Sequence, residues 1–181
     1  MRAFVLAAAA ALMLGACAIV PGAGAGAGAT LVAADASTSL AAGERIGADL
    51  STRGARDGMA SLVTLTLRHA DGRAMRFQQG NHTANDLLAQ RPGGALAQIM
   101  GLFGDEAPTL YRATPDQNRG APFICGADGP ALIGYYQGAD GAVQIVGLKQ
   151  EIQFETRPDG QAESLPYSPD QVCARLRFRQ G

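Results

Sequence analysis

Several kinds of function are disfavoured by what this sequence lacks. Its 181 residues include no tryptophan, two histidines and three cysteines, and the formal net charge at pH 7 is −1. A chain with this charge balance has no long-range attraction to nucleic acid or to anionic lipid. A transition-metal centre normally needs clustered Cys and His ligands, which the sequence does not supply. We therefore expect no cofactor, no metal and no nucleic-acid partner.

Familiar catalytic motifs are also missing. The sequence contains no Gly-x-Ser-x-Gly elbow of the kind that presents a serine nucleophile, and no phosphate-binding loop. His82 and Asp86 are four residues apart, so they could share a helix face with the histidine as an oriented general base. Asp105 follows in a loop. A hydrolase of envelope polymers built on His82, Asp86 and Asp105 is the alternative to the non-catalytic protein that we favour.

A short hydrophobic leader opens the chain. Residues 4–14 are an uninterrupted apolar run of 11, which is short of the roughly 20 residues that a membrane-spanning helix needs. The run suits the core of a secretory signal peptide. It ends in Leu14-Gly15-Ala16-Cys17, and this order of an aliphatic residue, two small residues and a cysteine resembles the lipobox of bacterial lipoproteins. The alternative is an ordinary secretory signal that is cut within residues 23–29.

The lipobox resemblance implies a location. In proteins with this motif the leader is cut before the cysteine, so residues 1–16 would be removed and Cys17 would carry two or three acyl chains. One acyl chain gives only marginal binding to a bilayer, whereas two or more hold a protein there. Ala18 follows Cys17, and an aspartate at that position retains lipoproteins at the inner membrane of enteric bacteria. The implied protein is anchored in the cell envelope, faces the periplasm and is sorted to the outer membrane.

The cysteine count agrees with a lipid anchor. An odd cysteine in an exported protein needs an explanation. If Cys17 carries lipid, Cys125 and Cys173 remain as a pair, and an oxidising periplasm favours a disulfide between them. The sequence therefore predicts one structural disulfide.

A segment rich in Ala and Gly follows the predicted anchor. Residues 21–29 read PGAGAGAGA, and residues 31–58 stay rich in small residues without a firm periodicity. Such segments behave as flexible linkers, although residues 30–34 could also form a short strand. The predicted organisation is a signal peptide at 1–16, an anchor and tether at 17–58, and one globular domain at 59–181.

Alternating apolar and polar residues predict strands in that domain. Residues 61–68 read SLVTLTLR, and a three-residue loop at 70–72 would set Leu67 opposite Met75 and Thr66 opposite Arg76. A similar loop at 139–141 would set Tyr135 opposite Ile145. His69 flanks the first loop, and we expect it to be solvated.

Strand and turn units recur with a 12-residue spacing at 126–137 and 138–149. A helical insert interrupts the predicted strands before these units: Thr83 is a candidate cap for a first helix, and residues 95–103 would place Leu96, Ile99, Met100 and Phe103 on one face of a second. A short helical turn is expected to hold Cys173. The predicted fold is mainly β (α+β), an antiparallel meander or a small barrel or sandwich with a short helical insert and one disulfide.

Arginines form the candidate binding surface. The final segment, ARLRFR, places Arg175, Arg177 and Arg179 on one face of a strand, and Arg68 and Arg76 share the outer face of the first hairpin. If these strands are neighbours, the side chains form a cationic face for an anionic envelope component or an acidic protein partner. The alternative is an edge strand that charge protects from aggregation. The favoured function is a non-catalytic binding or structural module of an envelope lipoprotein.

Overall fold

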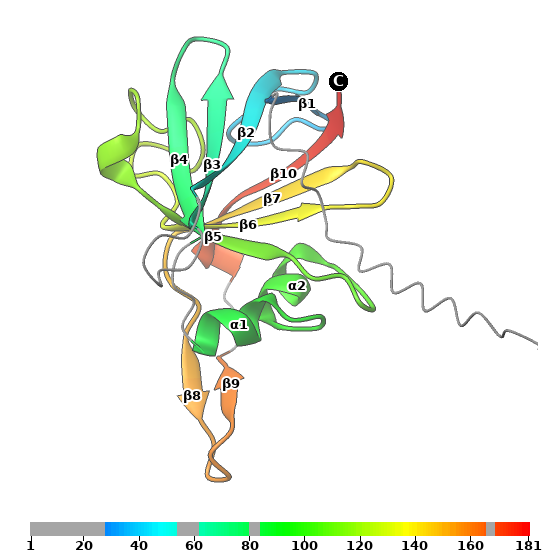
Figure 1. Ribbon diagram of the computed structural model, residues 1–181, viewed down its shortest axis with the longest axis vertical. Coiled ribbons are helices and arrows are strands. Elements are labelled where there is room, and N and C mark those ends of the chain that lie inside the picture. The colour runs from blue at the N-terminus through cyan, green and yellow to red at the C-terminus, as the bar shows by residue number, and fades with distance from the viewer. Residues whose placement is uncertain (1–27, 54–61, 80–83, 166–168) are drawn as a thin grey trace, which may run out of the picture.

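The computed structural model describes residues 28–53, 62–79, 84–165 and 169–181 (Figure 1). The predicted signal peptide and the lipid anchor at Cys17 lie outside the described residues. His82 and Thr83 lie outside them as well. The expectations for these residues therefore stay predictions.

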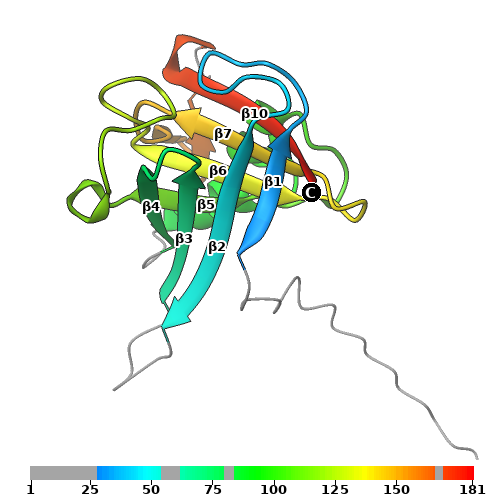
Figure 2. The same ribbon diagram turned by 90° about the horizontal axis from the view of Figure 1, so that it is seen from above.

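Eight antiparallel strands close into a barrel (Figures 1 and 2). Around the barrel the order is β1-β10-β7-β6-β5-β4-β3-β2, and β2 pairs with β1 to complete the circle. The strands are β1 (Ala29–Ala33), β2 (Arg45–Arg53), β3 (Leu62–His69), β4 (Ala74–Gln79), β5 (Thr109–Ala113), β6 (Leu132–Gln137), β7 (Val143–Leu148) and β10 (Val172–Gln180). Closure removes the exposed strand edges that promote aggregation. The predicted fold class is confirmed.

The folded domain begins earlier than predicted. Strands β1 and β2 belong to the barrel, so residues 29–53 are not part of a tether. The inward side chains of β2 include Ile46 and Ala48, and an alanine contributes little apolar area to a strand pattern. Small residues in a closely packed strand therefore resemble a linker when only composition is considered.

Both predicted hairpins have the expected register. Leu67 lies opposite Met75 and Thr66 opposite Arg76, and Gly72 in the connecting loop has a φ of 93°. Tyr135 lies opposite Ile145 in the second hairpin, where Gly141 has a φ of 80°. Glycine adopts positive φ values without the steric cost that other residues have. These loops therefore determine which faces of the strands turn inward.

Apolar side chains fill the barrel. Its core consists of inward residues from all the barrel strands and residues of two connecting loops, including the fully buried Phe77 and Phe178. Leu40 enters the core from the β1–β2 loop and Ile124 from the β5–β6 loop. The interior is a packed core, as is common for eight-stranded barrels of this size.

Two short helices, α1 (Ala84–Gln90) and α2 (Ala95–Met100), lie on the outer face of β5, β6 and β7 (Figure 1). Leu96 approaches β6 closely because Gly134 has no side chain there; a Cβ at Gly134 would lie 2.7 Å from Leu96 Cδ1. Phe103 is 82% exposed, and its predicted place on the helix face is wrong because α2 ends at Met100, before Gly101 with its φ of 70°. Within the described ranges, no helix is long and apolar enough to cross a membrane.

A hairpin of β8 (Phe154–Thr156) and β9 (Ala162–Ser164) projects from the barrel below the helices (Figure 1). Two 3-10 turns complete the described elements: η1 (Pro115–Gln117) follows β5 and η2 (Pro169–Gln171) precedes β10. Cys173 lies in β10 and not in the helical turn that the sequence predicted, because the turn ends at Gln171 and the strand begins at once.

The predicted disulfide is confirmed. Cys125 and Cys173 are bonded, with their Cα atoms 5.0 Å apart and a sequence separation of 48. The bond lies over Gly147 of β7, where a Cβ would be only 2.5 Å from Cys125 Sγ. The disulfide thus joins the last barrel strand to the loop before β6, at a point that only glycine leaves open.

Candidate functional site

The arginines of β10 face outward as predicted. Leu176 and Phe178 are buried in the barrel, while Arg175, Arg177 and Arg179 alternate with them on the exposed side. Arg175 also has a structural contact, because its guanidinium donates a hydrogen bond to the carbonyl oxygen of Ile99 in α2. That bond fixes α2 against the last strand.

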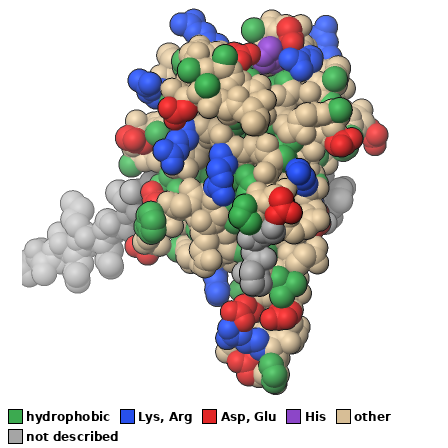
Figure 3. Space-filling model, turned by 180° about the vertical axis from the view of Figure 1, so that it is seen from behind, with side chains coloured by type: hydrophobic (Ala, Val, Ile, Leu, Met, Phe, Trp, Pro, Cys, Tyr) green, Lys and Arg blue, Asp and Glu red, His purple; other side chains and the backbone are tan. Residues whose placement is uncertain are grey.

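The two arginine groups do not lie on neighbouring strands, as a single cationic face would require. Strands β1 and β2 separate β10 from β3, and β4 lies one strand farther around the barrel. On the face shown in Figure 3, basic side chains are interleaved with acidic and uncharged ones. A surface that combines Arg68 and Arg76 with Arg175, Arg177 and Arg179 is therefore not formed, because barrel curvature turns the two groups in different directions.

Arg68 and Arg76 instead border a hollow on the outer face of β2, β3 and β4. We call it the β2–β4 trough; it has a volume of about 500 Å³. Asp49, Thr66 and Arg76 lie directly opposite one another across the three strands. Gln117 of η1 borders the trough as well.

The trough is rich in unpaired positive charge. Three arginines and one aspartate, Arg53, Arg68, Arg76 and Asp49, line it, for a net charge of +2. None of the four forms an ion pair with another residue in the described part of the chain. The sequence alone does not indicate Arg53, because it lies at the end of a segment whose composition resembles a linker.

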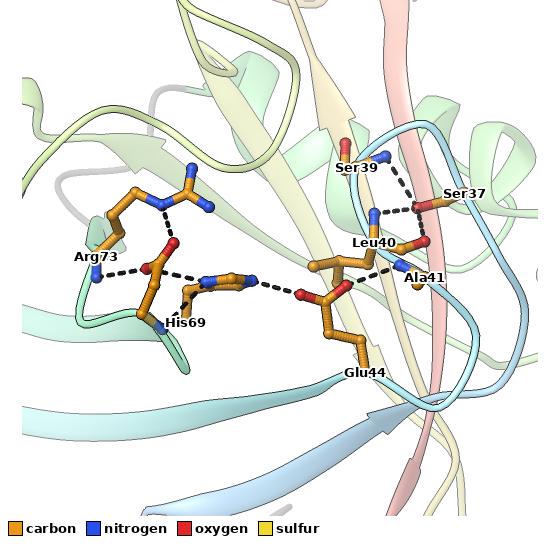
Figure 4. Close-up of polar contacts among 8 residues, drawn as sticks. Ser37, Ser39, Leu40, Ala41, Glu44, His69 and Arg73 are labelled. Atoms are coloured by element: carbon orange, nitrogen blue, oxygen red, sulfur yellow. Dashed lines mark hydrogen bonds and ion pairs between the residues drawn. The ribbon is translucent and has the colours of Figure 1, made fainter.

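A second polar group surrounds His69 at the end of β3 (Figure 4). His69 Nε2 lies 2.5 Å from Glu44 Oε1, and His69 Nδ1 lies 2.9 Å from Asp71 Oδ1. Arg73 Nε donates to Asp71 Oδ2 over 2.7 Å, and Glu44 Oε2 accepts from the backbone N–H of Ala41. The expectation of a solvated His69 is wrong: its side chain is 14% exposed.

The contacts of His69 alter several pKa values in this group. Burial lowers the pKa of His69, but its hydrogen bonds to Glu44 and Asp71 outweigh burial and raise the pKa overall. A hydrogen bond from the backbone of Arg73, together with His69, lowers the pKa of Asp71 to about 2. The backbone N–H of Ala41, followed by His69, lowers the pKa of Glu44. Protonated His69 therefore joins the β1–β2 loop to the β3–β4 loop by charge.

Stability should depend on pH through this group. The raised pKa of His69 contributes stability that is complete below the unfolded value of about 6.5 and is lost as pH rises through the folded value. The lowered pKa values of Glu44 and Asp71 contribute above about pH 4 and are lost in acid. We expect the melting temperature to fall between pH 6 and pH 8 for the native chain. A His69→Gln variant should show a smaller fall; equal falls would contradict the assignment.

Asp86, one of the candidate catalytic residues, is buried in α1 and bonded to Arg112 of β5. Arg112 Nη2 lies 2.7 Å from Asp86 Oδ1, and Arg112 Nη1 binds Glu151. Asp105 lies exposed in the loop after α2. The Asp86 carboxylate thus has a structural role in joining α1 to the barrel, and His82 lies outside the described residues.

The described residues of the trough are suited to binding by hydrogen bonds and charge. Within residues 28–53, 62–79, 84–165 and 169–181, no group of three or more His, Cys, Asp or Glu side chains could hold a metal ion.

Comparisons with known proteins identify no relative: no family model, curated protein or solved structure matches this chain. The trough offers guanidinium donors, hydroxyls that donate and accept, and one carboxylate that accepts.

Proposed function

We propose that this protein is a lipid-anchored component of a bacterial cell envelope whose barrel is a non-catalytic binding module. The Cys125–Cys173 disulfide is the observation that carries the proposal. It uses two of the three cysteines and leaves Cys17, at the end of the lipobox-like sequence, as the third. Structural disulfides persist in oxidising compartments, so the bond also favours export.

The filled barrel supports binding on the outside of the molecule. Eight-stranded barrels either pack their interior with side chains or hold one small ligand there. Here large side chains such as Phe77, Phe178 and Leu65 occupy the interior and are almost completely inaccessible to solvent. A ligand of this protein would therefore bind an outer face, where the arginines lie. With Ala18 after the anchor, the proposed location is the periplasmic side of the outer membrane.

Metabolic labelling with a palmitate analogue tests the anchor. The native chain should incorporate the label and sediment with membranes, because acylation at Cys17 would retain it there. A Cys17→Ser variant should lose both properties. The Cys125→Ser/Cys173→Ser variant is the matched control and should keep the label. Label retained after Cys17→Ser would refute the proposal, as would an unlabelled native chain.

A further inference from the structure

We propose that the β2–β4 trough binds an acidic oligosaccharide, a chain of hydroxyl-rich sugars that carries carboxylate or phosphate groups. The site follows from the geometry of three neighbouring strands. Only the source of the ligand, the cell envelope, rests on the proposed function. Four observations support the assignment: a buried hydroxyl, unpaired arginines, their spacing along the strands, and the polar chemistry between them.

The buried hydroxyl belongs to Thr66. This residue alternates with Leu65 and Leu67, whose side chains fill the barrel, so Thr66 faces outward into the trough. It is nevertheless only 5% exposed. Within the described residues its hydroxyl forms no hydrogen bond with a side chain or backbone group. Because a buried polar group without a partner is costly, this hydroxyl is a position where a ligand group could bind.

The arginines lie at two ends of the trough. Arg68 and Arg76 are diagonal neighbours on β3 and β4, because Arg68 lies opposite Ala74 and Arg76 lies opposite Thr66. Diagonal neighbours on one sheet face are within reach of long side chains. Arg53 lies at the far end of β2, six residues beyond Gly47, which pairs with Arg68. At about 3.4 Å per residue this separation is about 20 Å, so the trough suits an extended ligand with more than one acidic group.

Hydroxyl and amide side chains occupy the length between the arginines. Ser51, Thr64 and Gln78 lie opposite one another across β2, β3 and β4. Such groups both donate and accept hydrogen bonds, as the hydroxyls of sugars require. Guanidinium groups at the ends match carboxylate or phosphate oxygens through paired hydrogen bonds.

The trough is poorly suited to other anionic ligands. Leu62 is the apolar side chain among its described lining residues and none of them is aromatic, so nucleobases have no aromatic stacking platform there. Asp49 lies opposite Thr66, which in turn lies opposite Arg76. Its carboxylate would repel a uniformly charged polyanion but accepts hydrogen bonds from sugar hydroxyls. Arginines toward both ends, neutral hydroxyl and amide groups between them and a single carboxylate that accepts hydrogen bonds therefore favour an acidic glycan.

Calorimetric titration of the full-length protein in detergent micelles tests the site. The acidic probes are tetragalacturonate, which carries carboxylates, and phosphorylated maltotetraose; neutral maltotetraose is the control ligand. In about 0.15 M salt, which screens long-range attraction between exposed charges, at least one acidic probe should bind about 10-fold more tightly than the neutral one. Which probe binds identifies the acidic group. Binding of neither acidic probe, or equal binding of the neutral one, would overturn the assignment.

Variants separate the trough from general surface charge. Arg68→Gln/Arg76→Gln should weaken binding of the acidic probe at least about 10-fold, and Thr66→Val should weaken it several-fold while keeping the side-chain shape. Arg177→Gln/Arg179→Gln on β10 is the matched control, since it removes the same charge from another outer face, and should leave affinity unchanged. Equal losses in the two double variants would refute the trough. Binding does not need acylation and labelling does not need a ligand, so this proposal and the anchor can fail separately.

Discussion

Replacing both Cys125 and Cys173 with serine is expected to lower the free energy of unfolding by about 4 kcal/mol. The disulfide joins residues 48 apart, and a cross-link of that span restricts the unfolded chain by about this amount in the chain-entropy model. In the folded state it joins β10 to the loop that precedes β6. An ordinary domain has a free energy of unfolding of roughly 5–15 kcal/mol, so this loss is a large fraction of the total. The barrel should therefore remain folded but become clearly less stable without the bond.

Urea unfolding followed by circular dichroism measures this loss. Reducing the native chain with a thiol reagent should give a similar decrease without any substitution. The Cys17→Ser variant is the control for removing a cysteine, and its unfolding free energy should match that of the native chain. A decrease below about 1 kcal/mol after removal of the disulfide would show that the bond adds little to a barrel that other contacts already close.

Gly147→Ala is expected to destabilise the protein by about 1–3 kcal/mol, a range typical of overpacked cores. The added Cβ would lie 2.5 Å from Cys125 Sγ and 3.3 Å from Cys173 Sγ, so the disulfide or strand β7 must move. Gly147 has neighbours on both sides, β6 and β10, and this limits the movement of the strand. The expected cost arises from a steric conflict with one bond and not from the backbone conformation of the glycine.

A double-mutant cycle isolates this conflict. In the Cys125→Ala/Cys173→Ala background the sulfur atoms are gone, and Gly147→Ala should become nearly neutral. Gly47→Ala on β2 is the matched control, because its nearest neighbour across the strand, Arg68 Cβ, would be 3.5 Å from the new methyl group, an ordinary contact. Thermal unfolding of the variants gives the comparison. An equal cost of Gly147→Ala with and without the disulfide would contradict the steric explanation.

The parts of the fold that depend on neighbouring residues could be predicted. The register of β3 and β4 follows from alternation and from the loop that contains Gly72, and both are encoded within 20 residues. Closure of the barrel could not be predicted in this way. It depends on pairs such as Leu31 with Gln180, which are 149 residues apart in sequence. No local pattern identifies such partners.

In the candidate site, too, some residues could be predicted from their sequence neighbours and others depend on distant parts of the chain. Arg68 and Arg76 could be placed on one face of a hairpin from the sequence alone. Arg53 and Asp49 could not, because the small residues of β2 give no clear strand periodicity. The partner of His69, Glu44, lies 25 residues earlier, directly before β2, and only the pairing of β2 with β3 brings the two side chains together.

The pairing of β1 with β10 delays the last step of folding. Figure 2 shows the first and last strands side by side, and Leu31 is paired with Gln180, one residue before the last one in the sequence. During synthesis, β1 therefore waits for its partner until about 150 further residues have been made, since Leu31 and Gln180 are 149 residues apart. Contacts between such distant residues are slow to form. Until then β1 and β2 expose apolar side chains such as Leu31 and Ile46. A chaperone would therefore help this chain most before β1 pairs with β10.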